Sequence, residues 1–211
     1  MDQGQRKRGE SNHMRYTGPK DRLSRRENFD LFGAGAKITR LQVTPGVHGP
    51  KGTRGSSQYG KQLREKQKVK RMYGIMEKQF ENYMTEAFKS KGNTGEALLV
   101  TLERRLDNIV YRLGFAPSRP AARQLVTHRH VLLNAKKVNI PSLQVVVGDT
   151  ISLDGKGLTM PDVKKTLDLK DFTVVSWLTR KAAAGKVERL PSREDVPEAI
   201  SEQDIVEFYS R

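Results

Sequence analysis

The stretch from Glu103 to Asp149 constrains the fold of this chain more than any other segment. Between residues 98 and 113 the apolar side chains recur every three or four positions, which predicts a helix that Gly114 ends. Ser118 can cap a second helix, because a serine hydroxyl accepts a hydrogen bond from a backbone N–H of the first turn. Two short apolar segments then flank a tight turn at 134–135. We therefore expect two helices and a β-hairpin in one small unit.

This unit is also densely cationic. The whole chain carries 39 Lys and Arg against 24 Asp and Glu, a net charge of +15 with a pI near 10.1. Such a balance is typical of nucleic-acid binders, since each neutralised phosphate releases condensed counterions. The alternative is a generically basic surface without a specific partner. The basic side chains of the unit are Arg104, Arg105, Arg112, Arg119, Arg123, Arg129, Lys136, Lys137 and, when protonated, His128.

Charge and apolar pattern divide the chain into parts. Residues 1–94 carry 21 basic and 9 acidic side chains, whereas residues 161–211 carry 9 and 10, so phosphate contacts are expected mainly from the first part. Helical spacing predicts helices at about 59–73 and 75–89, separated by an αL residue at Gly74. The other expected elements are a short helix within 23–32 capped by Ser24, a turn and domain boundary at 90–96, strands at 131–134, 137–140, 144–147, 150–153 and 172–178, and a C-terminal helix from Ser201 with Ile205, Val206, Phe208 and Tyr209 on its buried face.

These elements predict an α+β fold in which a helical domain contains an inserted domain. A basic, largely irregular N-terminal arm spans 1–58, and its first thirteen residues are an extra polar tail rather than a targeting peptide, with Met14 as an alternative start. The helical domain spans 59–96 and is completed by 180–211. The inserted domain at 97–179 contains the two helices and the hairpin, in a motif at about 103–165.

No pattern in the sequence predicts a catalytic or metal site. The segment 55–62 has the glycine and lysine spacing of a phosphate-binding loop, but Gln62 replaces the Ser or Thr that holds magnesium, and no hydrophobic strand precedes it. His128 and His130 are too close together for a zinc-protease helix, and the chain has no cysteine to supply thiolate ligands. No apolar run reaches the length of a membrane span.

Four segments together resemble the small-subunit ribosomal protein S-four family, bacterial type. RLDNIVYRLGFAPSRPAARQLVTHRHVLLNAKKVNIPS is similar to the S-four RNA-binding motif, which also occurs in several RNA-modifying and tRNA-charging enzymes. The other three segments are MRYTGPKDRLSRRENFDLF, YGKQLREKQKVKRMYGIMEKQF and the C-terminal DIVEFYSR. The resemblance covers almost all of residues 14–211.

The resemblance implies a structural constituent of the small ribosomal subunit, located on the ribosome in the cytoplasm, and not an enzyme. Members of this family bind small-subunit rRNA directly at a junction of several helices, nucleate subunit assembly and contribute to translational accuracy. The implied partners are this rRNA, mRNA near the channel through which it enters the subunit, ribosomal protein S-five at the C-terminal segment, and other small-subunit proteins. No cofactor, metal, membrane or small-molecule substrate is implied.

A-form RNA is recognised mainly through its phosphates and 2′-hydroxyls, so we expect spaced basic side chains with a few stacking aromatic rings. One face is expected on the motif and a second on the helix at 59–73. Lys51 and Arg54 are implied by the resemblance alone, beside the mRNA channel. For any single side chain, a solvated charge remains the alternative. The predicted RNA-binding residues are Arg15, Tyr16, Arg25, Arg26, Lys51, Arg54, Tyr59, Lys61, Arg64, Lys68, Arg71, Arg104, Ser118, Arg119, Arg123, His128, Arg129, Lys136 and Lys137.

The chain departs from the family pattern in three respects. The cysteines that bind zinc in some members are missing, which implies the metal-free type, and the tail at 1–13 is extra. Ala135 stands where a glycine usually follows Asn134, although a two-residue hairpin turn favours Asn-Gly. The alternative class is an RNA-modifying enzyme or heat-shock factor that contains the module. That class needs a separate catalytic domain, for which no segment is long enough.

Overall fold

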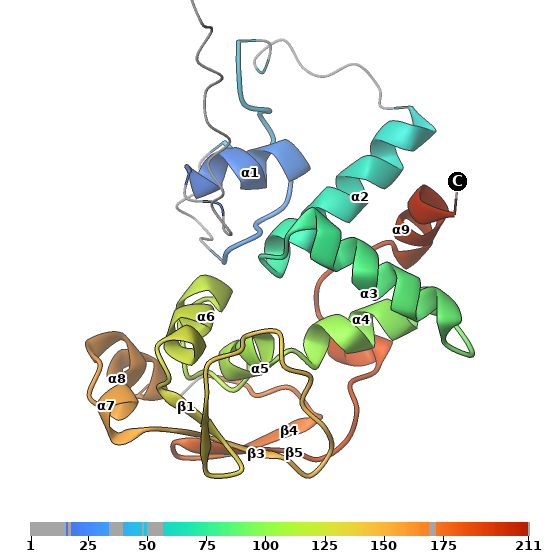
Figure 1. Cartoon of the computed structure of the whole chain (residues 1–211). Coiled ribbons are helices and arrows are strands. Elements are labelled where there is room, and N and C mark those ends of the chain that lie inside the picture. The colour runs from blue at the N-terminus through green and yellow to red at the C-terminus, as the bar shows by residue number, and fades with distance from the viewer. Residues whose placement is uncertain are drawn as a thin grey trace, which may run out of the picture.

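The computed structural model describes residues 16, 18–33, 40–47, 49, 57–168 and 172–210. The described residues form an α+β protein with two hydrophobic cores, one helical and one between helices and a sheet (Figure 1). The helices are α1 (Lys20–Glu27), α2 (Gln58–Met72), α3 (Glu77–Lys89), α4 (Thr94–Glu103), α5 (Leu106–Arg112), α6 (Arg119–Thr127), α7 (Gly155–Leu158), α8 (Pro161–Leu167), the 3-10 helix η3 (Arg193–Asp195) and α9 (Glu202–Tyr209). The strands are β1 (Val131–Leu133), β2 (Lys136–Val138), β3 (Thr150–Leu153), β4 (Leu178–Lys181) and β5 (Ala184–Val187).

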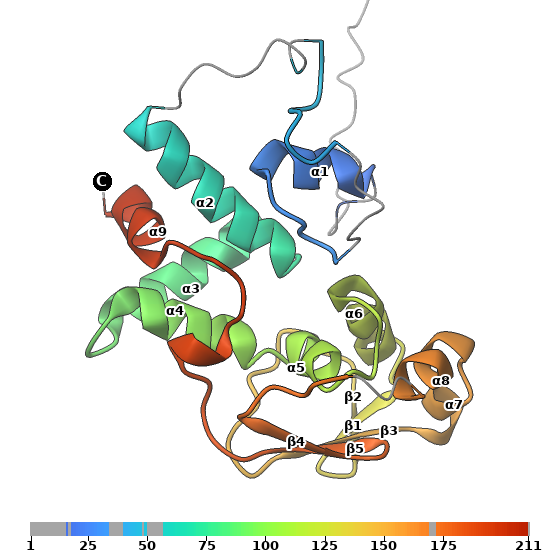
Figure 2. The ribbon, with the colours of Figure 1, turned by 180° about the vertical axis from the view of Figure 1, so that it is seen from behind.

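The first core lies among α2, α3, α4 and α9. Ser57 caps α2 by accepting a hydrogen bond from the backbone of Gly60, and Gly74, with φ of 64°, separates α2 from α3 as predicted. The C-terminal helix α9 packs beside α2 and α4, where Ile205 is fully buried (Figure 2). The C-terminal segment therefore completes a core that begins near residue 58.

The second core lies between α5, α6 and an antiparallel sheet with the strand order β2-β1-β3-β5-β4. The hairpin register is Val131 opposite Val138, and β1 continues against β3 with Val131 opposite Leu153. Leu113, at the end of α5, packs so closely on the sheet that a Cβ added at Gly185 would lie 2.5 Å from its side chain. Glycine on β5 therefore permits this contact.

Several local predictions are confirmed. The hydroxyl of Ser118 accepts a hydrogen bond from the backbone of Ala121, which caps α6. The hairpin of β1 and β2, the strand β3 and the C-terminal helix after Ser201 lie where the sequence predicts them. In α9 only Ile205 is fully buried, and the other three apolar residues of its predicted face are partly exposed.

The single helix expected at 98–113 is wrong, because Arg105 has a ψ of 136° and separates α4 from α5. The strand expected at 144–147 is also wrong. That segment bonds to the helix break instead, with Gln144 forming an isolated bridge to Arg105 and the backbone N–H of Val145 donating to the carbonyl of Arg104 at 3.0 Å. Both errors have one cause: the helix is interrupted at Arg105, and the distant segment 144–147 bonds to the backbone at this interruption.

Two further elements differ from expectation. α1 ends earlier than the predicted helix because Asn28 adopts αL geometry with φ of 49°, and Ser24 lies inside the helix rather than at its cap. The buried Ser24 hydroxyl accepts a hydrogen bond from the backbone N–H of Leu31. The strand expected at 172–178 is wrong, because β4 begins only at Leu178. The helices α7 and α8 and the strand β5 were not predicted.

Along the chain, the helical core ends and the second core begins after the predicted boundary at 90–96. Leu98, Leu99 and Leu102 of α4 belong to the helical core, and the second core begins at Leu106. The division into domains stays a prediction. The tail at 1–13 lies outside the described residues. Within the described part of the chain, no helix is long and apolar enough to cross a membrane.

Candidate nucleic-acid interface

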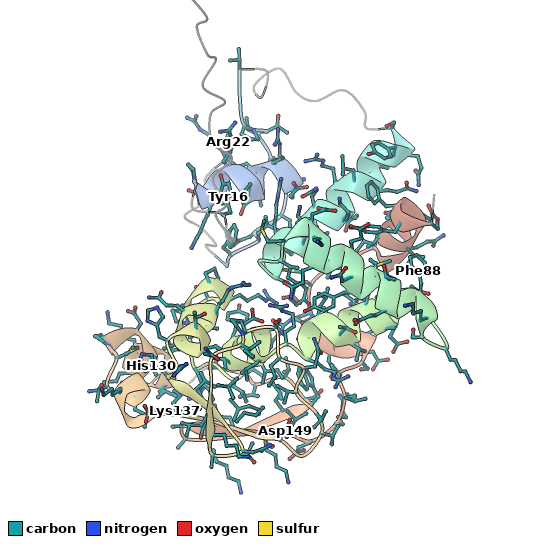
Figure 3. All side chains as sticks on the ribbon, in the orientation of Figure 1. Tyr16, Arg22, Phe88, His130, Lys137 and Asp149 are labelled. Atoms are coloured by element: carbon teal, nitrogen blue, oxygen red, sulfur yellow. The ribbon has the colours of Figure 1, made fainter. Side chains whose placement is uncertain are left out.

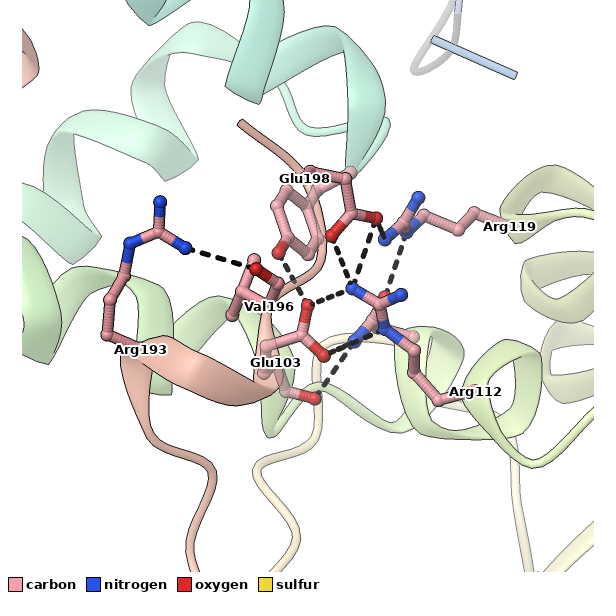
Figure 4. A network of polar contacts seen from close by, with 8 residues as sticks. Glu103, Arg112, Arg119, Arg193, Val196 and Glu198 are labelled. Carbon is pink, nitrogen blue, oxygen red and sulfur yellow. Dashed lines mark hydrogen bonds and ion pairs between the residues drawn. The ribbon is translucent and has the colours of Figure 1, made fainter. Parts of the chain in front are cut away.

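A buried ionic network joins the two cores (Figure 4). Glu103, at the end of α4, is fully buried and accepts hydrogen bonds from the Tyr73 hydroxyl at 2.6 Å, from Asn108 Nδ2 at 2.8 Å and from Arg112 Nη2 at 2.8 Å. Arg112 Nη2 also lies 2.8 Å from Glu198 of the C-terminal segment. The network thus connects the helical core, α5 and the chain that leads to α9.

The charges of this network stabilise one another. Burial alone would raise the pKa of Glu198, but Arg112 and Arg119 outweigh burial and lower it from 4.5 to about 2. Burial alone would lower the pKa of Arg112, yet Glu103 and Glu198 raise it above its ordinary value. Removing one partner would leave another charge buried without compensation, which costs about 3–5 kcal/mol in comparable cases.

Arg119, predicted to line the RNA-binding face of the motif, belongs to this network, and its contact with RNA stays a prediction. Its guanidinium lies 4.8 Å from the ring centroids of both Tyr73 and Tyr111. It donates to Asn108 Oδ1 at 2.9 Å and to Glu198 Oε1 at 2.8 Å, and its side chain is only 10% exposed.

Arg123 also faces inward, although less completely. It lies 3.7 Å from Asp107 and donates to the carbonyl of Gly74 at 3.4 Å, with 28% of its side chain exposed. Asp107 forms a closer pair with the buried Arg105, which also donates to the hydroxyl of Tyr83 at 2.7 Å. The face of α6 that carries Arg119 and Arg123 therefore attaches the motif to the helical core.

The cationic face predicted on α2 is partly covered by α1. Arg64 and Arg71 both pair with Glu27 of α1, whose carboxylate is fully buried. Burial raises the pKa of Glu27, and the two arginines oppose this effect. Lys68 pairs with Glu65 at 3.1 Å. The pairs of Arg64 and Arg71 with Glu27 hold α1 against α2. Arg64 keeps 41% of its side chain exposed, and a second RNA-binding face on α2 stays a prediction.

The remaining predicted residues differ in exposure. Arg25 and Arg104 donate to backbone carbonyls, of Val43 and Val145 respectively, and Ser118 serves as the α6 cap. Arg15, Lys51 and Arg54 lie outside the described residues. Tyr16 is 52% exposed, and Tyr59 is 49% exposed with its ring centroid 5.6 Å from that of Phe208. Among the predicted RNA-binding residues, the exposed basic ones are Arg26, Lys61, His128, Arg129, Lys136 and Lys137.

Most of these exposed cations border one side of the molecule. In both views α1, α6, α7 and α8 lie toward the same side, and α9 lies toward the opposite side (Figures 1 and 2). Figure 3 shows Tyr16 and Arg22 at α1 and His130 and Lys137 at the end of α6 and in the hairpin, all toward this side. Lys61 is exposed but lies in the first turn of α2, which is not one of the helices on this side.

The sequence reasoning missed the exposed cations of α1, α7 and α8. Lys20 and Arg22 precede the helix that the sequence predicted, and Lys156, Lys164 and Lys165 lie on helices that it did not predict. Within the described residues no group of three or more acidic, histidine or cysteine side chains could hold a metal ion. The arrangement is suited to contacting a polyanion over a broad surface.

Comparison with known proteins agrees with this geometry. The pattern described as the ribosomal protein S4/S9 N-terminal domain matches residues 15–103, and the S4 domain pattern matches residues 104–151. The small ribosomal subunit protein uS4 of Pelobacter propionicus is 51% identical over 207 residues, covering 93% of this chain and 99% of the relative. The proteins of the same name from Parabacteroides distasonis and a Geobacillus strain are 47% and 48% identical, with the same coverage. The chain belongs to the small ribosomal subunit protein uS4 family.

Proposed function

We propose that this chain is a structural, non-catalytic constituent of the small ribosomal subunit that binds small-subunit rRNA directly. The observation that carries the proposal is the side of the molecule bordered by α1, α6, α7 and α8. Exposed cations lie on or next to these helices, which pack around both hydrophobic cores. Contacts to phosphates and 2′-hydroxyls need such spaced cations and no base-reading element. A surface that spans two cores fits a multi-helix junction better than one duplex.

The buried network supports this proposal in a second way. Arg112, Arg119 and Glu198 fix the RNA-binding motif against the helical core, so the exposed cations of α1 and those that follow α6 are held in one arrangement. A surface that is rigid before binding loses less conformational entropy on association. Such a protein can bind RNA early, before other proteins have organised the junction, and we propose that it nucleates subunit assembly in this way.

The finer parts of the proposal concern partners and place. The C-terminal helix α9 lies away from the cationic side, and we propose that the C-terminal segment contacts ribosomal protein S-five and other small-subunit proteins there. Lys51 and Arg54 are proposed to lie near mRNA where it enters the subunit, with an effect on translational accuracy. The proposed location is the ribosome in the cytoplasm.

Co-sedimentation with small ribosomal subunits in a high-salt gradient tests the proposal. We expect the wild-type protein in the subunit fractions. The double variant Arg26→Glu with Arg129→Glu reverses two exposed cations of the cationic side and should shift protein to the free fractions. The matched control, Lys89→Glu with Lys91→Glu, reverses two exposed lysines at the end of α3 and should remain with the subunits. Recovery of wild-type protein only in the free fractions contradicts the proposal.

A further inference from the structure

A cleft of about 220 Å³ lies between α6 and α8, on the cationic side and apart from the buried ionic network. Its walls are mostly apolar and include Met160 and Pro161, together with the imidazoles of His128 and His130. The polar side chains of Gln124 and Asp162 complete the lining. A few polar groups set in an apolar, concave wall are typical of a site for a small, flat, partly polar molecule.

We propose that this cleft binds one unstacked nucleobase of the RNA, an inference that rests on the proposed rRNA binding. The size is suitable, because an enclosed cavity of about 150 Å³ in another protein admits benzene. The ring centroids of His128 and His130 lie 6.2 Å apart with their planes tilted by 52°, so the two imidazoles do not stack face to face on each other. Imidazole rings are among the aromatic groups on which proteins stack single-stranded bases.

Two polar side chains are placed to bond the edge of the base. Gln124 and Asp162 are exposed, and neither side chain has a hydrogen bond or ion pair within the described part of the chain. The amide of Gln124 can both donate and accept, and the carboxylate of Asp162 accepts from an exocyclic amino group. An apolar side chain of a protein partner would leave both groups without partners.

The charges around the cleft also favour a nucleotide. In the sequence Arg129 comes between His128 and His130, which line the cleft, and Lys164 and Lys165 come directly after the lining residue Val163. Lys156 lies on α7, where Gly157 packs against His130. All four cations are exposed, so they can contact the phosphates on either side of an inserted base.

Affinity of the full chain for a small-subunit rRNA transcript, measured by filter binding, tests the inference. Gln124→Trp places an indole over the mouth of the cleft without changing the charge, and His128→Ala removes one stacking ring. Each should weaken binding roughly tenfold, the scale of one lost base stack, with an unchanged salt dependence. Thr127→Trp is the control, since Thr127 is exposed on the same helix but does not line the cleft.

Ultraviolet crosslinking of the wild-type complex, mapped by mass spectrometry, tests the inference without any variant. A nucleotide attached to a peptide that contains residues 124–130 or 160–163 supports the site, and attachment only to other peptides overturns it. If the wild type binds rRNA and both cleft variants bind like Thr127→Trp, the cleft proposal fails alone. If the two cleft variants bind the rRNA transcript normally but no longer sediment with complete small subunits, the occupant of the cleft is a protein and the proposal fails. If the wild type does not bind rRNA, the proposed function fails as well.

Discussion

Replacing Ala135 by glycine should stabilise the protein. Asn134 and Ala135 form the two-residue turn between β1 and β2, and their φ angles are 49° and 65°. A type I′ turn requires positive φ at both positions, which an alanine adopts only with strain. The turn cannot relax into another form easily, because the amide of Asn134 donates to Asp149 at 2.7 Å and its Oδ1 accepts from the backbone N–H of Thr150 at 3.0 Å.

The expected gain is the difference between two effects. Left-handed geometry costs an alanine roughly 1–2 kcal/mol, which glycine avoids. Glycine also increases the conformational entropy of the unfolded chain, which costs about 0.4–1 kcal/mol. Because the strain is the larger effect, Ala135→Gly should raise the free energy of unfolding by about 0.5–1 kcal/mol. For a chain of this size, 1 kcal/mol corresponds to about 2–4 °C in the melting temperature.

Thermal and urea denaturation of the full chain, monitored by circular dichroism, measure this change. The turn between β4 and β5 provides matched controls, since Ala182 has φ of 51° and Ala183 is not among the residues with positive φ. Ala182→Gly should also stabilise the protein, whereas Ala183→Gly should destabilise it by about 0.4–1 kcal/mol. Destabilisation by Ala135→Gly equal to that of Ala183→Gly would refute the argument from turn geometry.

Glu198→Gln should make the variant less stable than the wild type at pH 6 by about 3 kcal/mol, since the pKa of Glu198 is lowered from 4.5 to about 2. Because the pKa of Glu198 is lowered in the folded protein, its contribution to stability is complete above pH 4.5 and is lost as the pH falls toward 2. The difference in unfolding free energy between wild type and variant, measured by urea denaturation, should therefore disappear over this pH range. A difference independent of pH contradicts the pairing with Arg112 and Arg119. Arg119→Glu should lower both the melting temperature and rRNA affinity, because it places a like charge beside Glu198, and an unchanged melting temperature contradicts its internal role. Arg129→Glu with Lys136→Glu should leave the melting temperature unchanged and reduce the slope of log affinity against log salt by about 2. An unchanged slope would show that these two cations do not meet phosphate.

Short-range chemistry explains the parts of the fold that the sequence predicted well. The α6 cap at Ser118, the αL break at Gly74 and the β1–β2 hairpin each depend on residues within a few positions of one another. Capping, positive φ and alternation are local effects and are therefore visible in a single sequence.

The failures depend on contacts between residues far apart in the sequence. Arg105 leaves the helical path where its guanidinium bonds to Asp107 and to Tyr83, which lies on α3. Helical periodicity continues through this position, so no local signal marks the break. The strand predicted at 144–147 is apolar and β-branched, yet its backbone bonds to the break itself. Tertiary pairing overrides propensity at both places.

The basic residues of the candidate site could be found from the sequence, but which of them pair within the protein could not. Arg64 and Arg71 were expected to face RNA, but their partner Glu27 lies on α1, more than thirty residues earlier in the chain. A helix face that carries arginines looks the same in the sequence whether its partner is an internal carboxylate or a phosphate. The distinction requires knowing which face the rest of the protein covers.

The net charge of the chain therefore includes two kinds of cation. Arg112 and Arg119 are bound internally by Glu198, whereas Arg129 and Lys136 are exposed at the end of α6 and in the hairpin. We expect the internal cations to affect RNA binding as well, because their pairs with Glu198 join the motif that carries the hairpin to the helical core. Loosening the network at Glu198 should thus lower rRNA affinity without removing any cation, and the loss should leave the salt dependence intact while the phosphate contacts remain. Affinity and salt slope together separate the cations that orient the surface from those that contact the RNA.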